Sequence, residues 1–255
     1  MRCPEGSAAQ AATLFLWAHR GASAVAPENT LAAFRAAEGA GAGGIELDVH
    51  LSRDGIPVVI HDETLERTSN GHGQVARWSA AELVLLDAGG WFAPAFSGER
   101  IPTLEQVLAW AGERLRVNIE IKTAAAGAAV LRLLRDFPRS RVLVSSFDHR
   151  LLTQLHQQDP ELSLGFLGET RFWRRGVRRA VAAGAESYHP RADLVSRPLL
   201  RACRSAGLAV YPWTIDAAAE VDRFLLLGVS GLFVNDPQCV AKHLKSKQTT
   251  LKLQE

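Results

Sequence analysis

The sequence predicts an α/β protein with a (β/α)8 barrel of the TIM type, somewhat irregular, with a small insertion after the third strand. Short apolar runs typical of buried strands alternate with helix-like stretches along most of the chain, which favours a parallel sheet with helices outside it. There are nine strand-like runs, one more than such a barrel needs. A turn signal at Asp54-Gly55 separates the second run from the third, so we expect the third run to pair back on the second as a hairpin.

The first elements are a strand, a helix and two further strands. Residues 13–18 form a short apolar run, and Gly21 marks the turn after it, which predicts a buried strand. The run Pro27-Glu28-Asn29-Thr30 supplies capping chemistry for a helix over residues 31–40. The next two strands are expected over residues 44–49 and 56–61.

Residues 63–103 interrupt this alternation. Glycines and prolines punctuate the segment, and residues 79–86 form its one convincing helix. We expect an insertion over one face of the barrel, since a long irregular segment in a compact fold is typically functional. We interpret the whole chain, residues 1–255, as one domain that carries this insertion.

Behind the insertion, strands and helices alternate to the end of the chain. The expected strands cover residues 116–121, 142–145, 162–167, 186–189, 208–213 and 231–234. The expected helices cover residues 125–136, 151–158, 173–183, 198–206, 218–227 and 239–244. Residues 1–12 are expected to be an unstructured lead, and the basic, polar tail after Lys242 a solvated or frayed end.

Composition excludes several classes of function. The 29 Lys and Arg residues nearly balance the 27 Asp and Glu residues, so the net charge of +2 gives no support for a nucleic-acid partner. Three widely separated cysteines predict a reducing compartment, with no zinc ribbon and no disulfide framework. No apolar run reaches the roughly 20 residues of a membrane span, and residues 11–18 lack the flanks of a signal peptide. We therefore expect a cytoplasmic protein; its oligomeric state stays open.

Three carboxylates predict a metal site. Strand alternation places Glu46 and Asp48 on one face of residues 44–49, and the same geometry places Glu120 and Lys122 together. Two inward-facing acids this close repel each other unless a cation joins them, and carboxylates without nearby cysteine suit Mg²⁺ or Ca²⁺ better than zinc. Each acid alone would more simply form a salt bridge. Three acids at the C-terminal ends of strands favour an active site, because barrel active sites lie there.

Two histidines complete this site. His19 and His61 each end an apolar strand, so both are expected at the barrel mouth, where they can divide general-acid and general-base work. Each of the other six histidines is interpreted as structural: His50, His72, His149, His156, His189 and His243.

Two cations stand beside these groups in the sequence, Arg20 after His19 and Lys122 close to Glu120. Three carboxylates and a dication sum to −1, and a bound phosphodiester adds another −1. Arg20 and Lys122 supply +2 and bring the site close to neutral, with Arg20 able to grip two phosphate oxygens. The residues together predict cleavage of a phosphodiester.

An ordered set of motifs resembles the glycerophosphodiester phosphodiesterase family, closest to its soluble bacterial cytosolic type. The motifs are His19-Arg20-Gly21, Pro27-Glu28-Asn29-Thr30, Ile45-Glu46-Leu47-Asp48-Val49 with Asp54-Gly55, Val59-Ile60-His61-Asp62, Leu65-Glu66-Arg67-Thr68-Ser69-Asn70-Gly71, Ile101-Pro102-Thr103-Leu104, Ile119-Glu120-Ile121-Lys122, Ser145-Ser146-Phe147, Pro212-Trp213-Thr214 and Asn235-Asp236-Pro237. The resemblance covers about residues 13–237.

The resemblance implies a (β/α)8 barrel whose 63–103 insertion is a cap, and hydrolysis of glycerophosphodiesters such as glycerophosphocholine or glycerophosphoethanolamine to sn-glycerol 3-phosphate and an alcohol. It also implies roles for single residues. His19 and His61 would be the acid/base pair, and Trp213 would line the glycerol or leaving-group side. The metal ligands would be Glu46, Asp48 and Glu120, with Arg20 and Lys122 on the phosphate.

The chain departs from the family pattern at Ile215-Asp216, where the family has Val-Asn, and at Asn235, where it has Thr. These departures concern substrate contacts rather than the chemistry. One alternative is a phospholipase-type enzyme acting on lysophospholipid head groups, which would need a membrane anchor that the sequence does not show. A second is a non-catalytic phosphodiester-binding protein, which should have lost one of the histidines or acids. The metal, the head group, the nucleophile (water or the glycerol hydroxyl) and which histidine is the acid stay open.

Overall fold

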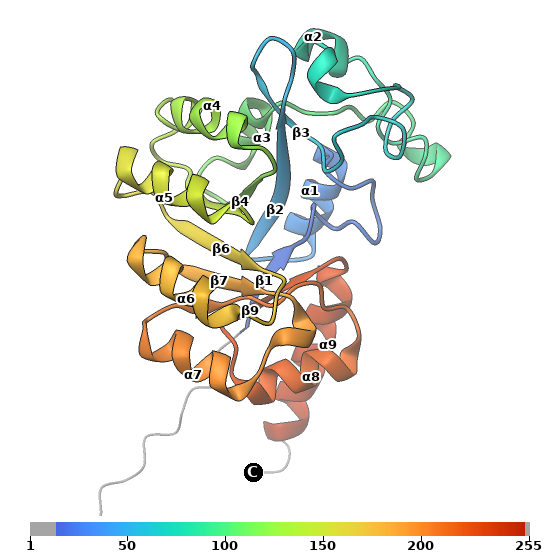
Figure 1. The fold of residues 1–255 in the computed structure, drawn as a ribbon. Coiled ribbons are helices and arrows are strands. Elements are labelled where there is room, and N and C mark those ends of the chain that lie inside the picture. The colour runs from blue at the N-terminus through green and yellow to red at the C-terminus, as the bar shows by residue number, and fades with distance from the viewer. Residues whose placement is uncertain (1–13, 253–255) are drawn as a thin grey trace, which may run out of the picture.

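The computed structural model describes residues 14–252, and the side chains of residues 14–247. The expected lead at residues 1–12 lies outside this part of the chain. Eight parallel strands form a barrel, in the order β8-β7-β6-β5-β4-β2-β1-β9 (Figure 1). They are β1 (Phe15–Ala18), β2 (Gly44–Leu51), β4 (Arg116–Ile121), β5 (Arg141–Ser146), β6 (Leu164–Gly168), β7 (Ser187–Pro190), β8 (Ala209–Val210) and β9 (Gly231–Val234).

The barrel is nearly closed between its last two strands. The Ser230 N–H donates to the Val210 carbonyl at 3.0 Å, and the Phe233 N–H donates to the Pro212 carbonyl at 3.0 Å. Strand β8 is shorter than the expected 208–213 because the chain meets Pro212, which has no N–H to donate. The (β/α)8 barrel predicted from the alternation of elements is confirmed.

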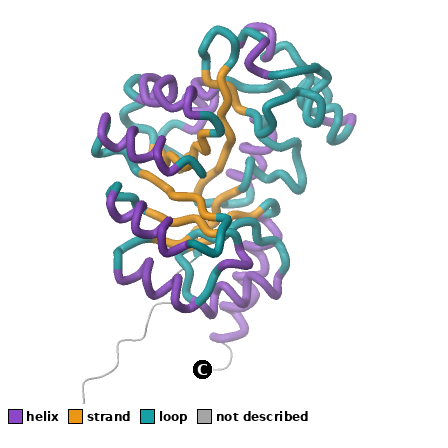
Figure 2. Tube along the Cα trace, viewed as in Figure 1, coloured by secondary structure: helices purple, strands orange, loops and turns teal. Residues whose placement is uncertain are grey.

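Helices lie outside this sheet (Figure 2). They are α1 (Leu31–Gly39), α3 (Leu104–Ala111), α4 (Ala124–Leu134), α5 (His149–Gln158), α6 (Trp173–Ala182), α7 (Arg197–Ser205), α8 (Ala218–Leu227) and α9 (Pro237–Lys252). Each packs an apolar stripe on the sheet. In α1 the Thr30 hydroxyl caps the first turn by accepting from the Ala33 N–H, and Ala33, Phe34 and Ala37 are the buried residues.

The expected hairpin is present. Strand β3 (Pro57–Val59) runs antiparallel to β2, with Val49 opposite Val59, and takes no other strand as partner. Gly55 closes the turn with a φ of +76°, a conformation that favours glycine. The extra strand-like run therefore lies outside the barrel.

Residues 63–103 form a largely irregular segment with a small apolar cluster of its own, which includes Leu65, Val75 and Leu83. It contains two short 3₁₀ turns, η1 (Val75–Arg77) and η2 (Pro94–Phe96), and helix α2 (Ala80–Leu83). The helix expected over 79–86 is wrong in length. It begins with a capping box between Ser79 and Glu82 but ends after one turn, and Leu85 is exposed.

Two other helices differ from expectation. Helix α3 was not predicted, although Thr103 and Gln106 form a capping box at its start. The tail after Lys242, expected to fray, continues as α9 to Lys252, because His243 and Lys247 both bind the Asp222 carboxylate of α8 at 2.8 Å. Across residues 14–252 we find no helix with the length and apolar character that crossing a membrane requires.

Candidate active site

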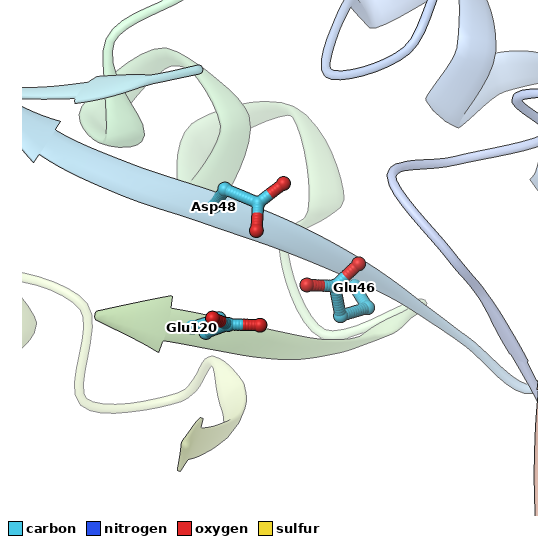
Figure 3. Close-up of side chains that lie close together, drawn as sticks. All are labelled: Glu46, Asp48 and Glu120. Carbon is cyan, nitrogen blue, oxygen red and sulfur yellow. The ribbon is translucent and has the colours of Figure 1, made fainter. Parts of the chain in front are cut away.

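The three predicted carboxylates meet inside the barrel. Glu46 and Asp48 extend from β2, and Asp48 is paired in register with Glu120 of β4 (Figure 3). One oxygen atom from each side chain lies within 4.8 Å of the others. All three are buried, with exposed fractions of 2%, 1% and 8%. Strand alternation, which the sequence shows, and the register of β2 with β4, which the structure shows, together bring the acids close.

The pKa values of these three acids are shifted in opposite directions. Desolvation and repulsion from Asp48 raise the pKa of Glu46 to about 8 and that of Glu120 to about 7. Burial also opposes the ionisation of Asp48, but Lys122 and Arg20 outweigh it and hold the pKa of Asp48 well below its usual range. Lys122 Nζ lies 2.9 Å from Asp48 Oδ1 and 2.5 Å from Glu120 Oε1.

These residues fit a hard divalent cation. Glu46 Oε1 is buried and accepts no hydrogen bond from the described residues. Metal–oxygen distances of about 2.0–2.6 Å allow ligand oxygens up to about 5 Å apart, which accommodates the 4.8 Å cluster. The cluster therefore could hold a metal ion.

The loop after β1 wraps around the carboxylates. The Arg20 backbone N–H donates to Glu46 Oε2 at 2.8 Å, and its guanidinium lies 3.3 Å from Asp48 Oδ2. Asn29 Nδ2 donates to the same Asp48 oxygen at 2.8 Å. Arg20 and Asn29 both have positive φ, near 57° and 59°, so the loop follows an unusual path to bring these donors to the acids.

His19 is oriented by a distant partner. Its Nδ1 lies 2.9 Å from Asn235 Oδ1. Asn235 Nδ2 donates to Asp216 Oδ2 at 2.7 Å, which fixes the amide so that its oxygen faces His19. The Nδ1–H of His19 then donates, and its Nε2 is left for other partners. Burial, with the positive charge of Arg20, lowers the pKa of His19 and favours the neutral ring.

His61 is oriented in a similar way. Its Nδ1 lies 2.6 Å from Asp62 Oδ1, which leaves Nε2 free, and its backbone carbonyl lies 3.0 Å from the ring nitrogen Nε2 of His50. Burial lowers the pKa of His61, outweighing the opposing pull of Asp48 and Asp62. Both histidines therefore present an unprotonated Nε2 at neutral pH.

One cavity of about 80 Å³ joins these groups. Seven of the eight residues singled out from the sequence line it: His19, Arg20, Glu46, His61, Glu120, Lys122 and Trp213. The eighth, Asp48, contacts Arg20 and Lys122. Four further residues that the sequence analysis did not single out complete the wall: Asn118, Phe147, Leu167 and Phe233.

The sequence analysis also missed a polar network behind the cavity. Arg67 binds Asp62, the partner of His61, and Glu28, the partner of Arg20. Arg67 and Glu28 lie inside motifs noted above, but nothing in their local pattern indicated that they meet. Asp216 and Asn235, where the chain departs from the family pattern, contact each other, and Asn235 also contacts His19.

Comparisons with known proteins identify the family to which the chain belongs. The model of the Glycerophosphoryl diester phosphodiesterase family matches residues 19–239. A glycerophosphodiester phosphodiesterase of Caldanaerobacter subterraneus is 39% identical over 231 residues, which is 87% of this chain and 93% of that protein. The structure of an Oleispira antarctica phosphodiesterase in complex with the product sn-glycerol-3-phosphate superposes with a TM-score of 0.83 at 30% identity, covering 90% of this chain and 96% of that one. A glycerophosphodiester phosphodiesterase structure from Agrobacterium tumefaciens gives a TM-score of 0.81 at 32% identity, covering 90% of this chain and 100% of that one. The chain therefore belongs to the glycerophosphodiester phosphodiesterase family.

Proposed function

We propose that this protein hydrolyses glycerophosphodiesters, such as glycerophosphocholine or glycerophosphoethanolamine, to sn-glycerol 3-phosphate and an alcohol. The observation that carries the proposal is a single cavity lined by His19 and His61, two of the buried acids and two cations. The names of the relatives and the product bound in the Oleispira structure support the same substrate class.

We propose Glu46, Asp48 and Glu120 as the ligands of one divalent cation, Mg²⁺ or Ca²⁺. All donors are oxygens and the cluster is compact, which suits these hard cations. When bound, the ion would draw negative charge away from the phosphate oxygens. Arg20 and Lys122 would bind the same phosphate, since both line the cavity and both already contact the acids.

The histidines would move the protons. Asn235 and Asp62 hold the Nδ1 atoms of His19 and His61, and neither Nε2 atom bonds to a described residue. One Nε2 would accept the proton of the attacking hydroxyl as its oxygen bonds to phosphorus. The other would first take up a proton at Nε2 from solvent, and would donate it to the leaving alkoxide as the second phosphorus–oxygen bond breaks. Trp213 lines the same cavity and would contact the glycerol or the leaving group.

The test is release of glycerol 3-phosphate from glycerophosphocholine and glycerophosphoethanolamine, with EDTA and then with Mg²⁺ or Ca²⁺ restored. Loss on chelation and recovery with one dication is expected, and activity untouched by EDTA would contradict the metal site. His19→Ala and His61→Ala should each lose most of kcat, while the exposed His72→Ala serves as the control. A near-normal kcat in either of the first two variants would contradict the paired role.

Two broader expectations stay as proposals. We propose that residues 1–255 act as one catalytic domain, with residues 63–103 as its insertion. We also propose a cytoplasmic location, on the basis of the sparse, widely spaced cysteines.

A further inference from the structure

A second, larger cavity adjoins the active-site cavity. Its volume is about 630 Å³, and Phe147 and Leu167 line both cavities. The Phe147 ring meets the Trp213 ring edge-on at 5.7 Å, at the boundary between the two. The other wall of the larger cavity is formed by the loop after β6 and by helix α6. This loop leaves the C-terminal end of a barrel strand, which is the end where barrel active sites lie. We call this larger cavity the groove. A group leaving the catalytic cavity past Phe147 would therefore enter this groove.

The groove is strongly basic. One carboxylate among the described residues, Glu169, lines the groove. Five arginines line it as well: Arg171, Arg174, Arg175, Arg178 and Arg179. All five are exposed, and none lies within ion-pair distance of a carboxylate among the described side chains. Arg174 instead lies over the Trp173 ring at 4.5 Å. Because the whole chain carries a net charge of only +2, this concentration of unpaired positive charge is a local feature.

A tyrosine hydroxyl also faces the groove. Tyr188 lines it with an exposed fraction of 2%, and its hydroxyl makes no hydrogen bond to the described residues. The hydroxyl lies so close to Gly168 and Gly176 that a Cβ there would stand 2.1 Å and 2.8 Å from it. Two glycines therefore leave room for a hydroxyl donor that has no partner.

We propose that this groove binds the alcohol part of glycerophosphodiesters whose alcohol carries a phosphate of its own. The inference rests on the proposed function and narrows its substrate class. Guanidinium groups and the Tyr188 hydroxyl are donors to phosphate, and a cationic alcohol such as choline would bind in this groove less well than a phosphorylated alcohol. The apolar residues Phe147 and Leu167 at the shared boundary would pack against the carbon skeleton of the alcohol.

A lipid surface is the competing occupant, since Phe172 beside the arginines is 80% exposed. The concave shape and the shared wall with the catalytic cavity favour a small ligand instead. A flat membrane would meet the rim of the groove but would leave Tyr188 without a partner.

The experiment compares sn-glycero-3-phosphoinositol with its inositol 4-phosphate counterpart, which differ only in the phosphate on the alcohol. The test variant is Arg174→Glu/Arg178→Glu. The control is Arg132→Glu/Arg135→Glu, which makes the same charge change at the C-terminal end of α4, on the opposite end of the barrel. Wild type should prefer the phosphorylated substrate about tenfold in kcat/KM. The test variant should lose that preference with less than about a twofold change on glycerophosphoinositol, and the control should keep it.

Other outcomes overturn the inference. Equal losses on both substrates, or an unchanged preference in the test variant, would contradict it. If wild type hydrolyses neither of these substrates nor glycerophosphocholine, the proposed function fails. Calorimetry with myo-inositol 4-phosphate then tests separately whether the groove binds a phosphorylated alcohol. Binding by wild type and the control but not by the test variant supports the site, whereas no binding refutes it. A third outcome would assign the groove to a membrane. In it, wild type and the control sediment with phosphatidylglycerol vesicles, the test variant does not, and the substrate preference is the same in all three proteins.

Discussion

Arg67→Ala is expected to lower kcat/KM about 10- to 100-fold, although Arg67 does not line the active-site cavity. Its guanidinium donates two hydrogen bonds to Asp62, at 2.6 and 2.9 Å, and two to Glu28, at 2.8 and 2.9 Å. Asp62 in turn holds His61, and Glu28 holds Arg20 at 2.8 Å. Arg67 thus positions one proposed proton carrier and one proposed phosphate ligand at once.

The cost to stability should be smaller than the cost to catalysis. A hydrogen bond to a charged partner contributes about 1.5–3 kcal/mol when well buried. The Arg67 side chain is 44% exposed, so solvent screening reduces its two ion pairs to a total of about 1–2 kcal/mol. Solvent does not reduce the catalytic cost in the same way. A small displacement of His61 or Arg20 from its position is enough to lower the rate strongly.

The assay measures kcat, KM and denaturant unfolding for Arg67→Ala beside Arg53→Ala. Arg53 is a matched control, since it is 60% exposed and pairs with Glu82 at 3.3 Å away from the cavity. Arg67→Lys should recover little of the lost kcat/KM, because one ammonium group cannot bridge two carboxylates as the planar guanidinium does. The penalties of Arg67→Ala and Asp62→Asn should be less than additive. If kcat/KM of Arg67→Ala equals that of Arg53→Ala, the positioning argument is wrong.

Three further predictions concern the carboxylates, the partner of His19 and pH. Asp48→Asn should lower metal-dependent activity by more than about 100-fold and weaken activation in a metal titration; wild-type activation would contradict its role as a ligand. Asn235→Ala should lower kcat about tenfold with little change in KM, because Nδ1 of His19 loses its acceptor, and steady-state kinetics at fixed metal would show it. In EDTA, the free energy of unfolding should fall between pH 7.5 and 8.5. Glu46, with its pKa raised to about 8, and in smaller part Glu120, with its pKa raised to about 7, hold protons in the folded state that the unfolded chain has released, and this window lies above the range in which the histidines of the unfolded chain titrate. Urea unfolding at both pH values, with and without the activating dication, checks this, and a stability that rises with pH in EDTA would refute it.

Most of the barrel and the centre of the site could be predicted from the sequence, because both depend on short-range rules. Strand alternation alone puts Glu46 and Asp48 on one face, and Glu120 was expected near them because it too ends a barrel strand. The register that pairs Glu120 with Asp48 is known only from the structure. The hairpin at Asp54-Gly55 follows from a turn signal between two apolar runs.

The groups that orient the site could not be predicted in this way. His19 and Asn235 are 216 positions apart, and Arg67 lies 39 positions from Glu28, so no local periodicity links them. Helix α9 was underestimated for the same reason, since its last turns depend on the Asp222 carboxylate of another helix. Helix α3 is a different case: its capping box was present in the sequence.

The charges of the site explain why its acids can be buried at all. Without a metal, burial favours the protonated form of Glu46 and Glu120, whose pKa values are raised to about 8 and about 7, and this lowers the cost of burying their charges. Asp48 stays ionised because Arg20 and Lys122 contact it. A dication at the three oxygens would displace the protons of the two glutamates and supply positive charge in their place. Metal and protons would therefore compete, and metal affinity should rise with pH until both glutamates have lost their protons.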